Sequence, residues 1–488
     1  MFETAEVGNE LSRAQFDGLE PKLREKLLAA QDAVHGSGRS VVILVGGVEG
    51  AGKAQLVDRL LSWMDARGIQ VHAFGDPDEE EAEHPRFWRY WRVLPPAGKT
   101  AIILGSWYTR PVVARALRKI KHAEFIEELD GIADFERMLT QEGVVLVKLW
   151  LHMSKKAQKK RLKGLEKDKL TRWRVTEQDW KYHKKYGRFR DASEEALRKT
   201  GTGFAPWTII EASDERWRDA TAMQKIVEAL ADVSKKRERG PTEPVPKPRK
   251  VNVISRLDLS KKLAEDEYKD ALAKNQARLA RLTRAMHEAD RSMILAFEGP
   301  DAAGKGGVIR RLTAAMDARN YRVISTAAPT EDERARPYLW RFWRDLPRLG
   351  NTTIYDRSWY GRVLVERLEG FAAPEEWKRA YGEIDAFEEQ LVDYGMIVLK
   401  FWLAVSPEEQ MRRFKSRRVT PYKQYKLTEE DWRNRAKFDG YVAAACDMIE
   451  KTSTENAPWV LVEADDKPWA RIKVFDAVIG ALEKALKE

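Results

Sequence analysis

The chain has 488 residues, which is long for a single hydrophobic core and favours two domains. Its net charge of +10 and its pI near 9.3 indicate a polyanionic partner, such as nucleic acid, an anionic membrane or a phosphate polymer. The single cysteine, Cys446, excludes a disulfide within the chain, and no apolar run is long enough to cross a bilayer. The first residues lack a secretory signal pattern, so we expect a cytoplasmic protein.

The first half begins with an amphipathic helix over about residues 20–34, followed by a short apolar strand and the sequence GGVEGAGK. Gly47, Gly52 and Lys53 in this sequence match the G-x-x-x-x-G-K pattern of a phosphate-binding loop. Further strands are predicted around HAF, before SWY, at VLVKLWL and at WTIIEA, with helical segments between them. Alternating strands and helices predict a parallel sheet with helices on both faces.

The whole pattern returns 252 residues later, as the pairs Gly47 and Gly299, Ser106 and Ser358, and APW at Ala205 show. A constant offset over so long a stretch predicts a tandem duplication. Between the copies, prolines and charges predict an extended linker. We therefore predict an N-terminal domain over 1–233, a linker over 234–250 and a C-terminal domain over 251–488. Each domain is expected to be an α/β, P-loop NTPase-like, three-layer fold with a helical lid.

The second loop, FEGPDAAGKGG, keeps Gly299, Gly304 and Lys305 of the pattern. Its glycines leave backbone N–H groups free to cradle phosphate oxygens, next to the positive end of a helix. One position departs, because Gly306 replaces the Ser or Thr whose hydroxyl binds Mg²⁺ in ordinary loops. The bland alternative is a tight turn between a strand and a helix that binds nothing.

Two carboxylates are the expected metal anchors in place of that hydroxyl. Asp301 lies inside the loop, and Asp356 follows the strand predicted at 352–355, at the edge of the sheet where ligands bind. The planar guanidinium of Arg357 suits the equatorial oxygens of a transferring phosphoryl group. The alternatives are a helix cap for Asp301 and a structural ion pair between Asp356 and Arg357.

The segment QMRRFKSRRVTPYKQYKLTEEDW is strongly basic and follows a predicted strand on the same side as the loop. A basic lid of this kind closes over phosphates in small-molecule kinases, and Pro421 predicts that its helix ends there. A merely solvated charged face is the alternative. For the Arg/Trp-rich stretch around 334–344, a basic face over an aromatic core and a phosphate or nucleotide rim remain open. The lid cations are Arg412, Arg413, Lys415, Arg417, Arg418, Lys423 and Lys426.

The two copies differ where the chemistry is expected. At an offset of 252, the first half has Glu49, Leu104, Gly105, Leu165 and Thr171. These replace Asp301, Asp356, Arg357, Arg417 and Lys423 of the second half. Without those charges the first copy is expected to be catalytically inactive, and to support assembly or to bind the anion.

The motifs of the second half, among them FEGPDAAGKGG, YLWRFWRDLP, YDRSWYGRVLVERLEGF and KFWLAVSPEEQMRRF, resemble the family 2 polyphosphate kinases, in the fused two-domain class. The resemblance implies transfer of phosphate from inorganic polyphosphate to AMP, with Mg²⁺, or Mn²⁺ as an alternative, held by Asp301 and Asp356. It implies catalytic roles for Lys305, Arg357 and Arg417 and an active second copy. The other expected phosphate-binding residues are Gly299, Ala303, Gly304, Gly306, Gly307, Arg413, Lys423 and Lys426.

Other functions stay open on the sequence. One is a polyphosphate-driven kinase for other nucleoside mono- or diphosphates, and another is an ATP-dependent nucleotide kinase. A distant one is a basic nucleic-acid-binding protein with a relict loop, although no nucleic-acid-binding signature supports it. We expect a homo-oligomer that engages polyphosphate and AMP or ADP, and neither nucleic acid nor membrane.

Overall fold

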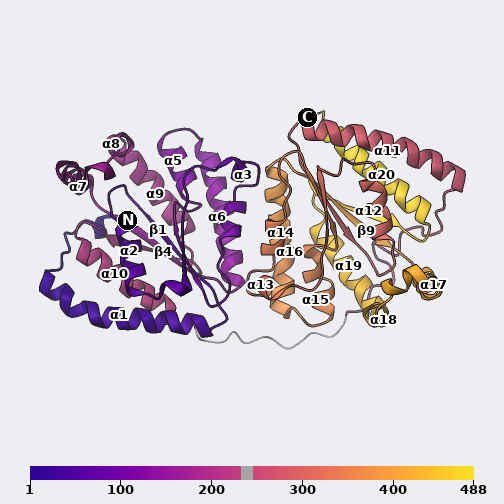
Figure 1. The fold of residues 1–488 in the computed structure, drawn as a ribbon, viewed down its shortest axis with the longest axis horizontal. Helices are drawn as coiled ribbons and strands as arrows, with labels where there is room; N and C mark the ends of the chain where they lie inside the picture. The colour runs from indigo at the N-terminus through magenta and orange to yellow at the C-terminus, as the bar shows by residue number, and fades with distance from the viewer. Residues whose placement is uncertain (232, 234–245, 488) are drawn as a thin grey trace. The chain divides into compact units, whose positions relative to one another are not determined.

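A computed structural model describes residues 1–231, 233 and 246–487, so most of the predicted linker, residues 234–245, lies outside the described residues. The chain forms two compact units (Figure 1). The first unit comprises the first half without Asp78–Trp88, together with Pro329–Trp340. The second unit comprises the second half without Pro329–Trp340, together with Asp78–Trp88. The two short segments are equivalent at the offset of 252.

The first half carries a five-stranded parallel sheet in the order β2-β3-β1-β4-β5. Its strands are β1 (Val41–Gly47), β2 (Ile69–Ala73), β3 (Thr100–Leu104), β4 (Val145–His152) and β5 (Trp207–Glu211). Its α-helices are α1 (Arg13–Gly36), α2 (Lys53–Trp63), α3 (Glu79–Ala82), α4 (Trp88–Arg92), α5 (Thr109–Ala116), α6 (His122–Gln141), α7 (Lys155–Lys167), α8 (Glu177–Lys184), α9 (Tyr186–Thr200) and α10 (Glu215–Leu230), and its 3₁₀ turns are η1 (Glu3–Ala5), η2 (Ala66–Gly68) and η3 (Arg172–Arg174).

The second half repeats this sheet as β7-β8-β6-β9-β10, again entirely parallel. Its strands are β6 (Met293–Glu298), β7 (Tyr321–Ser325), β8 (Thr352–Asp356), β9 (Ile397–Ala404) and β10 (Trp459–Glu463). Its α-helices are α11 (Glu265–Glu288), α12 (Lys305–Thr313), α13 (Glu331–Arg334), α14 (Trp340–Arg344), α15 (Val365–Leu368), α16 (Pro374–Asp393), α17 (Pro407–Val419), α18 (Glu429–Ala436), α19 (Phe438–Thr452) and α20 (Lys467–Ala485), and its 3₁₀ turns are η4 (Trp359–Arg362) and η5 (Pro421–Lys426).

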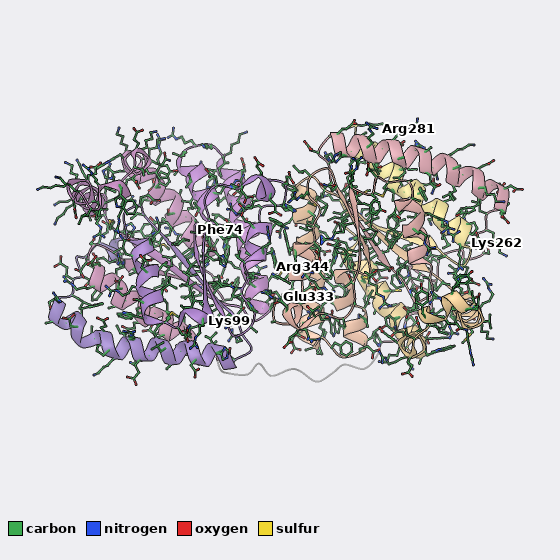
Figure 2. The ribbon with its side chains drawn as sticks, in the orientation of Figure 1. Phe74, Lys99, Lys262, Arg281, Glu333 and Arg344 are labelled. Atoms are coloured by element: carbon green, nitrogen blue, oxygen red, sulfur yellow. The ribbon has the colours of Figure 1, made fainter. Side chains whose placement is uncertain are left out.

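Each sheet is covered on both faces, and side chains fill the space between the layers (Figure 2). In the second half, residues of α11, α12 and α20 such as Leu279, Leu312 and Val478 form a continuous core with the strands. The opposite face is aromatic, because Trp359 packs edge-on against Phe387. Burying each such side chain stabilises the fold by roughly 1.5–3 kcal/mol. The predicted α/β, P-loop NTPase-like fold and its tandem duplication are confirmed.

A buried ion pair is repeated in both halves and ties the strand next to the loop to a helix. The Nζ of Lys400 on β9 lies 2.6 Å from Glu388 Oε2 on α16, and Lys148 and Glu136 repeat this distance of 2.6 Å. In the second half, the other Glu388 oxygen accepts hydrogen bonds from Trp359 and Tyr360. This network anchors the SWY turn that follows the tip of β8.

Two boundaries carry local explanations. The first helix begins at Arg13, earlier than predicted, because Ser12 and Gln15 form a capping box and Pro21 is accommodated inside the helix. Helix α17 ends at Val419, and Pro421 starts the 3₁₀ turn η5, as its missing N–H requires. None of the helices in the described parts of the chain combines the length and the apolar character needed to cross a membrane.

Candidate active site

The phosphate-binding loop of the second half is shaped by two glycines with a positive φ. Gly299 has φ 143°, and a Cβ there would lie 2.6 Å from the carbonyl oxygen of Leu403 on β9. Gly304 has φ 112° and is the N-cap of α12. Both conformations favour glycine strongly. The loop therefore delivers the N-terminus of α12, with its unpaired backbone N–H groups, to the carboxyl edge of the sheet.

Lys305 is the first residue of α12 and points back over the loop. Its Nζ donates a hydrogen bond to the carbonyl oxygen of Gly299 at 2.8 Å, and its side chain is buried. Burial, and then the positive charge of Arg357, lower the pKa of Lys305. A buried ammonium held against backbone carbonyls has few partners to give up when a phosphate group arrives.

Asp356 is the last residue of strand β8 and Arg357 follows it directly, so both lie at the strand tip where the sequence predicts them. Arg357 has φ 65°, a left-handed conformation that costs a non-glycine residue roughly 1–2 kcal/mol. Its Nη2 lies 2.6 Å from Asp301 Oδ1, and the Nδ2 of Asn434 on α18 lies 2.8 Å from the other Asp301 oxygen. Burial raises the pKa of Asp301, but Arg357, Lys305 and the Asn434 hydrogen bond outweigh it, so the pKa lies below its ordinary value. The Asp301 carboxylate is therefore held ionised between Arg357, after β8, and Asn434, on α18.

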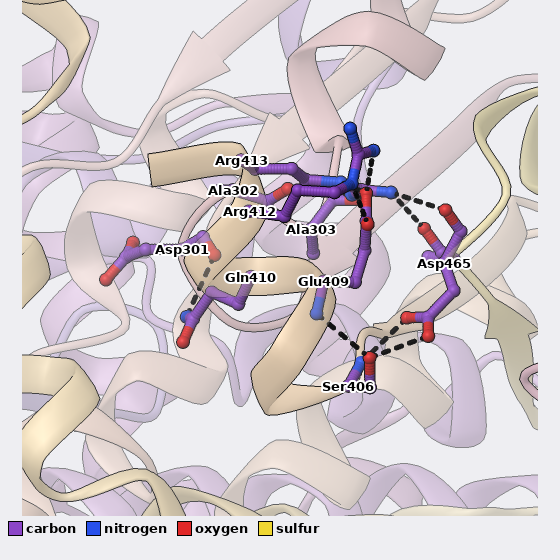
Figure 3. A network of polar contacts seen from close by, with 10 residues as sticks. Asp301, Ala302, Ala303, Ser406, Glu409, Gln410, Arg412, Arg413 and Asp465 are labelled. Atoms are coloured by element: carbon purple, nitrogen blue, oxygen red, sulfur yellow. Dashed lines mark hydrogen bonds and ion pairs between the residues drawn. The ribbon is translucent and has the colours of Figure 1, made fainter. Parts of the chain in front are cut away.

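Arg413 on α17 holds the loop from behind (Figure 3). Its Nη1 donates to the carbonyl oxygens of Ala302 and Ala303 at 2.8 and 2.9 Å. Its Nη2 donates to those of Ala464 and Asp465 at 2.6 and 2.9 Å. Its Nε donates to Glu409 at 2.6 Å. These contacts use the five N–H donors of a guanidinium, so Arg413 links the loop to the end of β10.

These elements enclose a cavity of about 560 Å³. Ten basic side chains and three carboxylates line it, and none of the lining residues that the structure describes is aromatic. The basic residues come from α12, the tip of β8, the lid elements α17 and η5 and the start of α20. The charged lining residues are Asp301, Lys305, Arg310, Arg311, Asp356, Arg357, Arg412, Arg413, Arg417, Lys423, Asp431, Lys467 and Arg471. Such a cavity is built for several phosphate groups at once.

Two halves of the chain, residues 10–238 and 262–488, each match the family profile described as polyphosphate kinase 2. The chain belongs to the polyphosphate kinase 2 family. It is 50% identical to a polyphosphate:AMP phosphotransferase of Pseudomonas aeruginosa, and the match covers 100% of both chains. It is 45% identical to a polyphosphate:AMP phosphotransferase of Pseudomonas syringae, and that match covers 99% of both chains. A crystal structure of a Pseudomonas aeruginosa protein assigned to polyphosphate kinase 2 superposes with a TM-score of 0.91 at 48% identity over 100% of both chains.

Of the predicted catalytic and phosphate-binding residues, the structure gathers all but two around this one cavity, whereas the predicted lid cations Lys415 and Arg418 do not belong to its lining. Gly299 lies at the entrance to the loop and packs against β9 instead. The side chain of Lys426 lies outside what the structure describes. The residues that line the cavity as predicted are Asp301, Ala303, Gly304, Lys305, Gly306, Gly307, Asp356, Arg357, Arg413, Arg417 and Lys423.

Several residues around the kinase cavity were not identified from the sequence. Lys467 and Arg471 reach it from α20, and burial, with Arg413 nearby, lowers the pKa of Lys467 to about 8. Asn434, on α18, donates a hydrogen bond to Asp301 of the cavity lining. Glu298, buried at the end of β6, accepts hydrogen bonds from the backbone N–H and the hydroxyl of Ser358, both at 2.8 Å. The offset of 252 pairs Lys467 with Glu215, and this charge reversal could have identified it.

The arginines of the Arg/Trp-rich stretch behave differently. Arg334, Arg336, Arg341 and Arg344 are all described and do not belong to the cavity lining. Beside them, Phe342 packs edge-on against Trp359, and Trp343 against Phe387. This geometry matches the basic face over an aromatic core.

The equivalent loop of the first half is filled by its own side chains. Lys53 Nζ lies 3.2 Å from Glu49 Oε2. The buried guanidinium of Arg218, on α10, donates to the carbonyl oxygen of Ala51 at 3.3 Å, and a Cβ on Gly52 would overlap its Nη1. The second half has Ala470 at the position of Arg218, and Ala470 lines the open cavity. A cation of the chain thus lies in the first loop where the second loop has room for a ligand.

Proposed function

We propose that the second half of this polyphosphate kinase transfers the terminal phosphate of inorganic polyphosphate to AMP, giving ADP and a polymer one phosphate shorter. The observation that carries polyphosphate as the donor is the cavity, in which ten cations face a phosphate-binding loop and none of the described lining residues is aromatic. A linear phosphate chain needs such a basic site and no base pocket. AMP as the acceptor rests on the full-length relatives.

Each residue has a role that follows from its position. Lys305 and Arg357 neutralise charge on the transferring phosphoryl group and orient it for in-line attack. Arg417 and Lys423, on the lid segment, bind the phosphates that follow along the polymer and exclude water. Asp356, at the tip of β8, would hold the metal together with Asp301 and so orient the acceptor phosphate. Transfer then needs no covalent intermediate on the protein.

The residues present fit Mg²⁺ or Mn²⁺. Asp301 and Asp356 line the same cavity, and Asp356 Oδ2 would lie 3.9 Å from a Cβ on Gly306, the position that carries the metal-binding hydroxyl in ordinary loops. Each carboxylate oxygen keeps lone pairs beyond its present hydrogen bonds. The described residues contain no cluster of three metal-ligating side chains, so substrate phosphates and water would complete the octahedron that Mg²⁺ requires. Bound metal would neutralise charge between the polymer and the acceptor phosphate.

Product analysis tests the function directly. Purified full-length enzyme is supplied with AMP, Mg²⁺ and long-chain polyphosphate, and in a second arm with ATP in place of the polymer. We expect ADP in the first arm and its loss in Asp356→Asn. ADP formed only with ATP would indicate an ATP-dependent nucleotide kinase, and preferred phosphorylation of ADP or GDP would indicate a different acceptor class.

We further propose that catalysis lies within residues 251–488 and that the domain of residues 1–233 transfers no phosphate. The pairing of Lys53 with Glu49 and the Arg218 guanidinium in the first loop support this assignment. A homo-oligomer also remains part of the proposal, and light scattering of the purified protein tests it.

A further inference from the structure

The charge around the two loops is very different. The cavity of the second half has ten basic and three acidic lining residues. The equivalent positions, 252 residues earlier, hold five basic and five acidic residues, so their net charge is zero. The basic set is Lys53, Arg59, Lys160, Arg161 and Arg218, and the acidic set is Glu49, Asp58, Asp179, Glu215 and Asp219. The first loop has lost the potential that attracts phosphates, while the chain as a whole stays strongly basic.

The first half has a high positive charge on an outer helix instead. Helix α7, KKAQKKRLKGLEK, carries seven basic residues and one acidic residue. Its counterpart in the lid, α17, PEEQMRRFKSRRV, carries five basic and two acidic residues. The helix next to the neutral loop is therefore the more positive one. Lys155, Lys156 and Lys159 stand where α17 has Pro407, Glu408 and Met411.

These lysines are open to solvent. The residues Lys155, Lys156, Lys159, Lys160 and Lys163 are all exposed, and the side chains of α7 extend away from the ribbon (Figure 2). Among the described residues, no carboxylate forms an ion pair with any of the five. The surface continues into η3, where Arg172 and Arg174 are exposed beside Trp173. From Lys155 to Arg174 the chain carries ten basic residues and two acidic ones, Glu166 and Asp168, so this stretch keeps a large positive excess.

This arrangement opposes the stability of the helix. Lys155 with Lys159, and Lys159 with Lys163, are like charges four residues apart on one helical face. Lys155 and Lys156 also lie in the first turn, at the positive end of the helix dipole. Local helix stability does not explain such a surface, but a polyanion that binds to it does.

We propose that the exposed basic surface of α7 and η3, defined by Lys155, Lys156, Lys159, Lys160, Lys163, Arg172 and Arg174, is a second binding surface for inorganic polyphosphate. The proposal rests on the proposed function, because it takes polyphosphate as the donor polymer. Binding there is electrostatic and independent of the first loop, which its own Arg218 fills. A polymer held by this surface is presented to the enzyme at a high local concentration.

The test uses full-length enzyme and compares two variants that each lose four exposed cations from the first half. One is K155Q/K156Q/K159Q/K163Q on α7. The matched control is R13Q/K22Q/R24Q/K26Q on the exposed side of α1. Equilibrium binding of end-labelled long-chain polyphosphate and of tripolyphosphate is measured over a salt series, together with KM and kcat for both donors.

We expect the α7 variant to bind the long polymer about tenfold more weakly, with a salt slope smaller by about 3 because roughly 0.7 is lost per phosphate contact. Its KM for long polymer should rise, while kcat and the constants for tripolyphosphate should stay within about twofold of wild type, because a short donor cannot occupy two surfaces. Equal behaviour of the α7 variant and the α1 control would overturn the proposal. A matching loss with tripolyphosphate would also overturn it.

Binding of single-stranded RNA of similar charge is measured in parallel, to test whether the surface binds nucleic acid instead of polyphosphate. Trp173→Ala should leave polyphosphate binding unchanged, because the polymer has no bases to stack on the exposed ring. RNA that binds more tightly than polyphosphate, and that loses affinity in Trp173→Ala, would reassign the surface to nucleic acid. If the wild-type enzyme fails to phosphorylate AMP, the proposed function fails while the binding arms still decide the surface. Normal turnover with unaltered polymer binding in the α7 variant rejects the surface alone.

Discussion

Arg413 gives the sharpest test of how this site is assembled, because a basic lid residue can either bind phosphate or hold the loop. Its guanidinium contacts four backbone carbonyl oxygens at 2.6–2.9 Å, and its side chain is buried. In Arg413→Ala four carbonyl oxygens lose their donor, and at about 1 kcal/mol each, the low end of the cost of an unsatisfied acceptor, the total is about 4 kcal/mol. Glu409 adds little to this figure, because Arg412 still contacts both of its oxygens at 2.6 and 2.7 Å.

For a unit of this size, about 4 kcal/mol corresponds to a fall of roughly 10 °C in Tm. Calorimetry should show that fall in one of two transitions, and kcat should drop because the loop around Ala302 is no longer held. Arg413→Lys offers at most three donors and should recover only part of the Tm. Arg417→Ala, on the cavity wall, is the matched control and should raise KM for polyphosphate with Tm nearly unchanged. If Arg413→Ala behaves like Arg417→Ala, with an unaltered Tm, Arg413 binds substrate and does not position the loop.

Three further predictions concern other parts of the chain. Lys305→Ala should abolish transfer whereas Lys53→Ala should leave it within about twofold, and equal losses in a turnover assay would contradict the asymmetry between the halves. Arg218→Ala should destabilise the first unit by about 3–5 kcal/mol, because the buried Asp219 loses its partner at 2.7 Å and keeps the longer ion pair with Arg59 at 3.4 Å. The calorimetric transition temperature of that unit should fall while kcat is retained. Asn434→Ala removes a hydrogen bond that lowers the pKa of Asp301, so the acid limb of the kcat/KM profile should move to higher pH, and an unmoved limb would show that this carboxylate does not control activity.

The sign of the acid effect follows from the direction of the shift. Asp301 has a pKa below its ordinary value of 3.8 in the folded chain, so its ionised form stabilises the fold. That contribution is complete above the ordinary value and is lost as the pH falls through the lower folded value. Acid unfolding of the second unit should therefore begin at a higher pH in Asn434→Ala than in wild type.

The fold could be predicted because its signals are local and occur twice. Apolar strands, the loop glycines and the constant offset of 252 each point to the same parallel sheet, and an error in one copy is corrected by the other. Asp301, Lys305 and Asp356 could be predicted for a similar reason, because each lies at a strand end or inside the loop, where the topology itself defines the active edge.

The roles of the cations depend on contacts that the sequence does not contain. Arg413 and Arg417 stand four residues apart in one basic run, yet one contacts four carbonyl oxygens from two distant segments. Lys467 enters the cavity from a helix more than a hundred residues beyond the loop, and only the packing of α20 brings it there. The left-handed backbone of Arg357 was equally hidden, because no pattern marks an arginine that adopts a glycine conformation.

At the start of the last helix in each half, the structural residues are the same in both copies but the charged residues near the loop differ. Asp214 and Asp466 both cap the helix by accepting the N–H of the tryptophan three residues on, at 2.8 Å. One turn further, Arg471 on the cavity wall corresponds to Asp219, which pairs with the guanidinium that fills the first loop. The cap and the tryptophan are the same in both copies, whereas the side chains that face the phosphate site have reversed charge. Our proposal that the first half transfers no phosphate leaves its outer surface as the place where a polyanion would bind. The exposed lysines of α7 are the part of that surface whose charge local stability does not explain.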